Sequence, residues 1–471
     1  MTARPARILA AGLLALSAVL MAVWYTYEQV GRTPSEIVDY LQRRLQGHPT
    51  LEAVMNPLLS AVLQLLDEPD SRLRATPFTV PRMPPNPAIA GGAGPRLASA
   101  APALADPAGL PGAQRIRVGP GQAITSISMA AKLARDGDTI EIEPGDYIAD
   151  TALWDRDRLT IRGMGPQVRL VAAGAHVEGK AIWVVRRGRV TIEGIDFVGA
   201  RVPDGNGAGI RFESGHLVIK NCNFHGNQSG ILSGNDAGST LEIEGSEFGY
   251  NGAGDGQTHG VYVGRIHRLR VTGSYFHHGN VGQLIKSRAQ YSEITYNRIT
   301  DETGGRSSYE LEFPNGGLVR VIGNIVQQGA ETENSVMVSY GVEGYTWPQN
   351  RLFLVHNTLV NDRPYGGTFV RVSPGAEQVV MRNNLLAGLG KVKGSDVLDA
   401  VGDRRVGWPD FELAAREDYR LKAGSRDGLA LTPGRLVEPS MVPRYQYAHP
   451  RGLTALADTP SHPGAVQTPG R

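Results

Sequence analysis

The chain has 471 residues, 41% of them hydrophobic, and a formal net charge of +2, because 48 Lys and Arg nearly balance 46 Asp and Glu. This balance gives no argument for nucleic-acid binding, which requires a strongly basic face, so no nucleic-acid partner is expected. The single cysteine, Cys222, excludes an internal disulfide, and we interpret it as a packed core thiol.

The amino terminus carries a membrane-targeting signal. Residues 8–24 are apolar and uncharged, and Arg4 and Arg7 precede them. A run of about 17 residues is close to the lower limit for a spanning helix. It ends in Trp and Tyr, which suit a membrane interface better than a cleavage site. Residues 1–30 are therefore predicted to be an uncleaved signal anchor. The rest of the chain would then lie outside the cytoplasm, in the cell envelope; a cleaved signal would instead give a secreted protein.

Residues 31–70 are predicted to be a helical, membrane-proximal segment. Ile37, Leu41 and Leu45 recur at a spacing of four, which is typical of an amphipathic helix. A second apolar stripe consists of Leu58, Leu59, Val62, Leu65 and Leu66. The segment is either a helical hairpin or an oligomerisation helix. Residues 71–114 are rich in Pro, Ala and Gly and are predicted to be a linker.

Residues 115–424 contain a repeat that defines the fold. An eight-residue motif recurs eight times, with a strand and a turn in each copy. Its third position is always aliphatic and its eighth is always large and apolar. The copies begin at Val190, Leu217, Leu241, Leu269, Ser292, Val319, Leu352 and Gln378. A period of roughly 25–30 residues without helices predicts an all-β chain, a single right-handed parallel β-helix in which neighbouring copies stack to form the core.

Two features refine this prediction. The sixth position of the last four copies is asparagine, at Asn297, Asn324, Asn357 and Asn383. Side-chain amides stacked in one column predict an asparagine ladder inside the turn. At the start of the solenoid, residues 124–133 carry apolar side chains at helical spacing, which predicts a short helix that caps the open end. Residues 425–471 are predicted to be an irregular tail.

The first coils and the local motifs indicate a family. The segment GDTIEIEPGDY (Gly137–Tyr147), followed by the coils, resembles the pectate-lyase-like superfamily of bacterial right-handed β-helix repeat proteins. The segment Leu284–Arg288 is similar to the Lys-Ser pair of chondroitinase B and alginate lyase type polysaccharide lyases. The next coil departs from those lyases, because it carries Glu310 and Glu312 where they show arginine. The resemblance implies an anionic polysaccharide as substrate or ligand.

Charged side chains are expected on one outer face of the solenoid. Strand alternation places Lys286 and Arg288 outward on one coil, and Glu310 and Glu312 outward on the next. His259 and Tyr262 come from the preceding coil. Lys286, His259 or Tyr262 is the expected acid or base for proton transfer at C5 of a uronate, and Arg288 is the expected clamp for its carboxylate.

Other residues are expected to contact the substrate beside this group. Tyr340 and Arg371 are expected to do so together with Glu310 and Glu312. The two glutamates can bind a calcium ion or serve as an acid/base pair; no other cofactor is expected. His277 and His278 form either a polar surface turn or a metal or substrate contact.

Three functions follow from these patterns. The first is an exported, membrane-tethered enzyme with lyase or C5-epimerase chemistry on an anionic polysaccharide. The second is a non-catalytic carbohydrate-binding or scaffolding solenoid of the cell envelope, in which Lys286–Glu312 and Arg288–Glu310 are only cross-coil ion pairs. The third, ranked last, is a glycoside hydrolase that uses Glu310 and Glu312.

Overall fold

The computed structural model describes residues 112–332, 334–364, 366–394, 397–426, 428–429, 431 and 438–467, together with 78–81 and four helical positions between 53 and 59. The predicted anchor lies outside the described residues, as do most of the predicted helical segment and the linker. Within the part that is described, no helix is long and apolar enough to cross a membrane. The chain divides into two units, and the solenoid belongs to the second, which comprises Val80–Arg363 and Thr368–Arg471.

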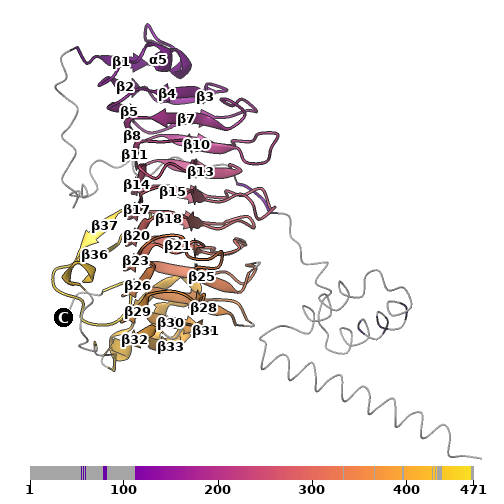
Figure 1. Ribbon diagram of the computed structural model, residues 1–471, viewed down its shortest axis with the longest axis vertical. Coiled ribbons are helices and arrows are strands. Elements are labelled where there is room, and N and C mark those ends of the chain that lie inside the picture. Colours follow the sequence, from indigo (N-terminus) through magenta and orange to yellow (C-terminus); the bar gives the residue numbers. More distant parts are fainter. Residues whose placement is uncertain are drawn as a thin grey trace, which may run out of the picture. The chain divides into compact units, whose positions relative to one another are not determined.

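The solenoid consists of three parallel sheets, and each coil contributes one strand to each sheet in turn (Figure 1). Sheet A is formed by β1 (Arg115–Val118), β2 (Thr139–Ile142), β5 (Leu159–Gly163), β8 (Arg189–Glu193), β11 (His216–Lys220), β14 (Thr240–Glu244), β17 (Arg268–Thr272), β20 (Tyr291–Thr295), β23 (Leu318–Ile322), β26 (Arg351–Val355), β29 (Gln378–Arg382) and β32 (Leu398–Val401). Each copy of the eight-residue motif therefore begins on a strand of sheet A and ends on a strand of sheet B.

Sheet B follows after a short turn in each coil. Its strands are β3 (Gly145–Ile148), β6 (Val168–Val171), β9 (Asp196–Val198), β12 (Asn223–His225), β15 (Glu247–Gly249), β18 (Tyr275–His277), β21 (Arg298–Thr300), β24 (Ile325–Gln328), β27 (Thr358–Asn361), β30 (Leu385–Gly388) and β33 (Arg404–Val406). Most of these strands are only three or four residues long, so each one adds few side chains to the core.

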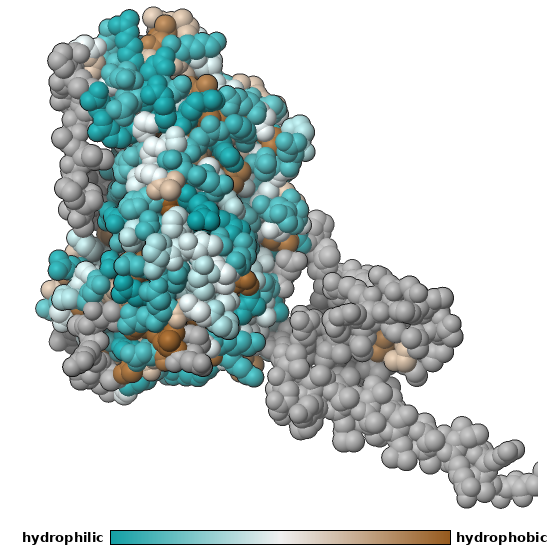
Figure 2. Space-filling view, in the orientation of Figure 1, coloured by the Kyte–Doolittle hydropathy of each residue, from teal (hydrophilic) through white to brown (hydrophobic). Residues whose placement is uncertain are grey.

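Sheet C closes each coil. Its strands are β4 (Ala152–Asp155), β7 (Ala181–Arg187), β10 (Ala208–Phe212), β13 (Ser229–Ser233), β16 (Val261–Val263), β19 (Ile285–Ser287), β22 (Leu311–Phe313), β25 (Val336–Tyr340), β28 (Thr368–Val372) and β31 (Lys391–Lys393). The outside of the solenoid in the view of Figure 2 is mostly hydrophilic, with small separate hydrophobic areas.

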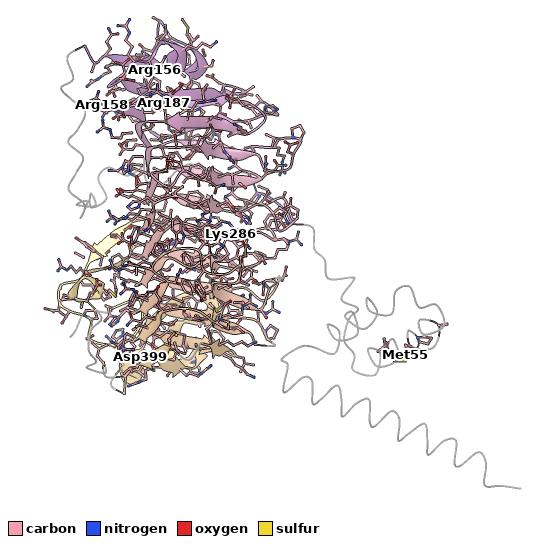
Figure 3. All side chains as sticks on the ribbon, viewed as in Figure 1. Met55, Arg156, Arg158, Arg187, Lys286 and Asp399 are labelled. Atoms are coloured by element: carbon pink, nitrogen blue, oxygen red, sulfur yellow. The ribbon has the colours of Figure 1, made fainter. Side chains whose placement is uncertain are left out.

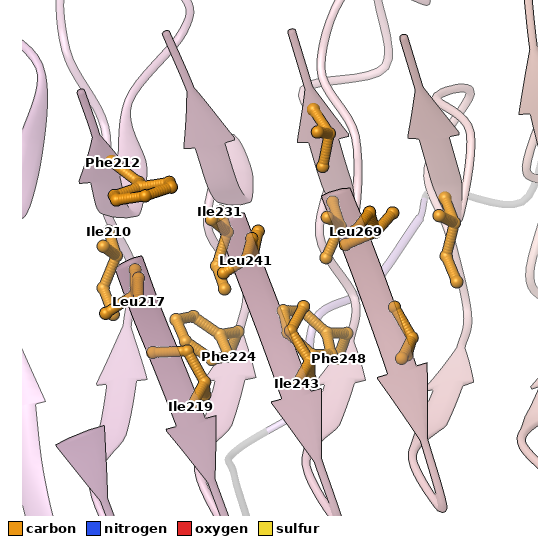
Figure 4. Packing of buried hydrophobic residues seen from close by; sticks show 14 of the residues in the cluster. Ile210, Phe212, Leu217, Ile219, Phe224, Ile231, Leu241, Ile243, Phe248 and Leu269 are labelled. Carbon is orange, nitrogen blue, oxygen red and sulfur yellow. The ribbon is translucent and has the colours of Figure 1, made fainter. Parts of the chain in front are cut away.

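The core consists of the two apolar columns that the repeat predicts. Phe197, Phe224, Phe248 and Phe276 are at most 1% exposed, and their rings stack face to face with centroids 4.6–4.9 Å apart. The aliphatic side chains of the third position lie beside them, as Ile219 and Ile243 do in Figure 4. The prediction of a β-helix with these columns inside is confirmed.

The asparagine ladder is present, with one correction. The Oδ1 atom of Asn324 accepts from the backbone N–H of Asn297 at 2.9 Å, and Asn357 repeats this contact with Asn324. The last member is Asn384 rather than Asn383, since Asn384 Oδ1 accepts from the N–H of Asn357 at 2.8 Å. The eighth copy therefore begins at Val379, which pairs with Leu352. A shift of one residue exchanges the inward and outward side chains of a strand.

A helix covers the amino-terminal end of the solenoid, as predicted. Helix α5 (Ile127–Leu133) begins after Ser126, whose hydroxyl accepts from the N–H of Met129 at 3.3 Å. The Asp150 carboxylate accepts from the N–H groups of Ile127 and Ser128, at 2.6 and 2.9 Å. These contacts satisfy donors of the first turn, so the helix is fixed against the first coils.

The chain after the solenoid contains regular elements. They are β34 (Phe411–Leu413), β35 (Asp418–Leu421), α6 (Ala423–Arg426), β36 (Tyr445–Tyr447), β37 (Leu453–Ala455) and the 3-10 turns η2 (Trp408–Asp410), η3 (Ala414–Arg416) and η4 (Pro439–Met441). Met441 packs on Ile322 and Phe353 outside sheet A. Arg451 forms a hydrogen bond with Asn223 on sheet B. The described part of the tail thus covers portions of sheets A and B.

Candidate functional site on sheet C

One outward column runs along sheet C, with one residue from each strand in register. Its members are Leu153, Val184, Arg211, Leu232, Tyr262, Lys286, Glu312, Ser339, Arg371 and Lys393. The column is largely apolar at the amino-terminal end and polar or charged from Tyr262 onward. Lys286 lies near the middle of the solenoid (Figure 3). The column thus becomes polar at Tyr262, the first of the candidate site residues on it.

Lys286 forms an ion pair with the next coil. Its Nζ lies 2.8 Å from Glu312 Oε2, and 3.7 Å from Glu343 Oε1 on the segment that follows β25. The Lys286 and Glu312 side chains are only 13% and 5% exposed. The two residues therefore meet in a partly desolvated position, and the expected cross-coil contact between them is present.

Arg288 contacts three polar side chains at once. Its Nε donates to the Tyr262 hydroxyl at 3.0 Å, and its Nη1 donates to Asn315 Oδ1 at 2.5 Å. Both terminal nitrogens donate to the Glu343 carboxylate, at 2.5 and 2.9 Å. This bidentate contact raises the pKa of Arg288 and lowers that of Glu343. We refer to Tyr262, Lys286, Arg288, Glu312, Asn315 and Glu343 as the Lys286 cluster.

Glu343 was not identified from the sequence. It lies on residues 341–350, the long connection from β25 to β26. The connection is held by Tyr345, whose hydroxyl donates to Ser373 O at 2.7 Å, and by Trp347, whose Nε1 donates to Arg288 O at 3.1 Å. The only available signal was the length and aromatic content of this insert, which does not reveal where its carboxylate lies.

His259 lies under the ring of Tyr262. The two rings are stacked with centroids 5.5 Å apart, and His259 is 4% exposed. The N–H of Gln283 donates to its Nδ1 at 3.2 Å. Burial, reinforced by the charge of Lys286, lowers the pKa of His259 to about 3. Its imidazole is therefore neutral near pH 7 with the proton on Nε2, which makes it a donor rather than a base.

Glu310 does not join this cluster, so its expected outward position and its pair with Arg288 are wrong. It is 0% exposed, and its carboxylate has contacts of 3.4 Å with Ser307 Oγ and Gln328 Nε2. Burial and the nearby charge of Asp301 raise its pKa well above the usual value. The cause of the error is local: Glu310 precedes β22 at a corner where two successive residues, Glu310 and Leu311, both point inward.

Tyr340 and Arg371 have different positions. Tyr340 is a core residue that is 0% exposed, and its hydroxyl donates to Gly317 O at 2.7 Å. A buried Tyr340 does not fit the predicted contact with a substrate. The outward position of β25 belongs to Ser339, which is in register with Glu312. Arg371 lies outward as expected, in register with Ser339, and its Nη2 donates to the Tyr309 hydroxyl at 3.4 Å. Arg371 thus extends the polar column beyond the Lys286 cluster.

The structure does not assign a metal. Among the described residues, no group of three or more His, Cys, Asp or Glu is arranged to hold an ion. Glu310 and Glu312 point to opposite sides of β22, so they do not form the calcium-binding pair considered above. His277 and His278 lie at the end of β18, with their Nδ1 atoms 2.7 Å apart, and Tyr250 stacks on His278. They are on sheet B and contribute nothing to the sheet C column.

A comparison with protein-family models agrees with this architecture. Residues 206–388 match a family model described as "Right handed beta helix region". The solenoid is a right-handed parallel β-helix. The match confirms the resemblance to right-handed β-helix repeat proteins that the sequence indicated. One similar solved structure is the crystal structure of pectate lyase Pel9A, with 14% sequence identity, a TM-score of 0.49, and coverage of 76% of this chain and 97% of that chain. No curated protein matches the sequence.

Proposed function

We propose that this β-helix protein acts on an anionic polysaccharide bound along the outer face of sheet C, between β16 and β28, by lyase or C5-epimerase chemistry. The observation that carries the proposal is the Lys286 cluster, in which two cations, a phenol and two carboxylates converge from four coils. Successive coils repeat at about 4.8 Å, so the face presents polar groups along a line that a polymer can follow.

The chemistry requires three groups around the acidic C5 carbon: a cation for the uronate carboxylate, a base and an acid. Arg288 supplies the positive charge, and Lys286 lies two residues before it on the same coil. The hydroxyl oxygen of Tyr262 accepts from Arg288, which leaves its O–H to donate to a leaving oxygen. Glu312 Oε2 lies 2.8 Å from Lys286 Nζ and fixes the position of this amine, which we assign as the base.

Neutral His259 completes the proposed site from below. Its Nε2–H can donate to a sugar hydroxyl, because its Nδ1 is already occupied by the N–H of Gln283. Arg371 lies three rungs beyond Lys286 and can bind a second acidic sugar. The proposal also includes export of the solenoid and its attachment to a membrane through residues 1–30. Amino-terminal sequencing of the exported protein tests that part, because a start near residue 25–35 would mean a cleaved signal.

A non-catalytic scaffold is the second candidate, and one observation favours it. Lys286 and Glu312 are paired in register on adjacent strands, which is how a charge pair covers a sheet without any catalytic role. The hydrolase is no longer a candidate, because Glu310 and Glu312 do not face the same side of the strand. The scaffold and the enzyme differ in whether Lys286 is needed for product formation.

The test is an activity assay on a panel of polyuronates and glycosaminoglycans, with the unsaturated product followed by absorbance. Lys286→Ala is expected to lower the rate by roughly 10²-fold, as for loss of a general base. The matched control is Lys220→Ala, which removes a lysine paired across rungs with Glu244 on sheet A, 3.6 Å away, and should leave the rate unchanged.

If wild type and Lys286→Ala both bind a glycan and neither forms product, the enzyme hypothesis is wrong and the scaffold hypothesis is favoured. For an epimerase, exchange of the C5 hydrogen with solvent deuterium takes the place of the absorbance signal. Absence of exchange, product and binding on every polymer would overturn both candidates.

A further inference from the structure

The Lys286 cluster already contains a bound carboxylate, that of Glu343. Two guanidinium nitrogens of Arg288 donate to its two oxygens, and Lys286 Nζ lies 3.7 Å from Oε1. Asn315 Oδ1 shares Nη1 of Arg288 with Glu343. A planar guanidinium with parallel bonds to both oxygens is the arrangement by which arginine recognises carboxylates in general. The cluster therefore has the geometry of a carboxylate-binding site.

Glu343 is the most accessible member of the cluster. Its side chain is 44% exposed, whereas those of Lys286 and Arg288 are 13% and 16% exposed. Gly341 and Gly344 flank it with φ of +77° and +87°, a conformation in which glycine costs little. The anchors of the insert, Tyr345 and Trp347, follow this segment. The carboxylate can thus leave Arg288 while the aromatic side chains remain docked.

We propose that Arg288, beside Lys286, forms the subsite for the substrate's carboxylate, and that Glu343 fills this subsite in the free protein until a uronate carboxylate displaces it. The inference rests on the proposed function and extends it to the regulation and specificity of the site. A neutral hydroxyl or a methyl ester cannot replace the two charge-assisted bonds that Glu343 makes, so only a charged sugar competes successfully.

This competition also restores the charge balance of the site. With Glu343 in place, Lys286 and Arg288 face the two carboxylates of Glu312 and Glu343. When Glu343 withdraws, one positive charge is left without a partner in the cluster, and an incoming uronate neutralises it. The protein therefore avoids an uncompensated, partly buried cation in the absence of substrate, which would be costly.

The test compares two sugars that differ in the carboxylate, D-galacturonate and D-galactose, by titration calorimetry or ligand-observed NMR. Glu343→Gln keeps the size of the side chain and removes its charge. We expect it to bind galacturonate about tenfold more tightly than wild type, since one charge-assisted competitor is lost. The affinity for galactose should not change. Adding Arg288→Lys to Glu343→Gln should abolish the gain, because lysine cannot form the bidentate contact.

Glu178→Gln is the matched control, because Glu178 also bridges a lysine and an arginine, Lys180 and Arg186, at a distant position. It should leave galacturonate binding unchanged. A thermal unfolding curve for each variant verifies that the fold is intact.

The outcomes separate the inference from the proposed function. Turnover of a polyuronate by wild type, with equal galacturonate affinity in wild type and Glu343→Gln, would overturn the inference alone. If Glu343→Gln binds galacturonate more tightly but no polymer is bound or turned over, the carboxylate subsite is supported. The proposed function on a polysaccharide is then overturned. Equal gains for galactose and galacturonate would also overturn the inference, because the displaced group would then not be a carboxylate competitor.

Discussion

The outer faces of sheets A and C carry charges in different ways. On sheet A, Glu242, Arg270, Glu293 and Arg320 occupy one column in register, so the sign alternates from rung to rung. Arg270 lies 3.7 Å from Glu242, and Arg320 lies 3.5 Å from Glu293. Every charge in this run has an opposite charge on an adjacent strand, and Arg320 also contacts Glu438, from the chain after the solenoid, at 2.9 Å.

Sheet C does not follow this rule. Its column contains one in-register pair, Lys286 and Glu312, and Arg371 has Ser339 and Lys393 as its neighbours. The carboxylate that binds Arg288 comes from the insert at residues 341–350 instead of a neighbouring strand. The sheet A column is therefore an alternating run in which each charge is matched by a neighbouring strand, whereas Arg288 beside sheet C is matched by a carboxylate from an insert. The second arrangement is the one that calls for a functional explanation.

Both faces rest on one core, so the largest expected effect comes from that core. Phe248→Ala removes a ring stacked between Phe224 and Phe276, and should lower the free energy of unfolding by about 3–5 kcal/mol through the cavity it leaves. Denaturant unfolding followed by circular dichroism measures this change. A loss below about 1 kcal/mol would mean that the ring stack is not what supports both faces.

Glu310 is a buried acid behind sheet C, and sheet A serves as the comparison for the effect of its replacement on stability. Because the folded-state pKa of Glu310 is raised, wild type loses stability as the pH rises above the value for an unfolded glutamate, about 4.3. Glu310→Gln should be more stable than wild type by about 1–3 kcal/mol at pH 8, and the difference should vanish near pH 4.

Unfolding measured at both pH values tests this prediction. Glu377→Gln, at the half-exposed turn before β29, serves as the control for the loss of one carboxylate. A Glu310→Gln variant that is less stable than wild type at pH 8 would contradict it, since the carboxylate would then be stabilised by a partner.

The smallest expected effects compare the two charge columns directly through double-mutant cycles for stability. The Glu242–Arg270 pair on sheet A should show a coupling of about 0.2–1 kcal/mol, as partly exposed pairs do. The Lys286–Glu312 pair should couple by about 1–3 kcal/mol, because its side chains are more buried. Raised salt should weaken the first coupling more than the second. Equal couplings with equal salt dependence would remove the distinction between the two faces.

The repeat in the sequence determined the coil, the parallel stacking and the interior columns. Aliphatic and aromatic side chains at fixed positions can be buried only if successive copies stack in register, so the pattern has one solution. Outward positions in the middle of a strand, such as Lys286 and Glu312, followed from alternation and were also correct. The last copy failed by one residue, because Asn383 and Asn384 fit the pattern equally well and only strand pairing distinguishes them.

Corners and inserts required the tertiary structure. At the start of sheet C strands, consecutive residues point inward, as do Leu284 with Ile285 and Met337 with Val338, so strict alternation misplaced Glu310. The position of Glu343 depends on where Tyr345 and Trp347 dock, on contacts with residues that are distant in the sequence. Local patterns specify what a regular stack must bury, whereas the path of a connection is decided by the surfaces it meets, and that is why the sequence identified Lys286 and Arg288 but not the carboxylate between them.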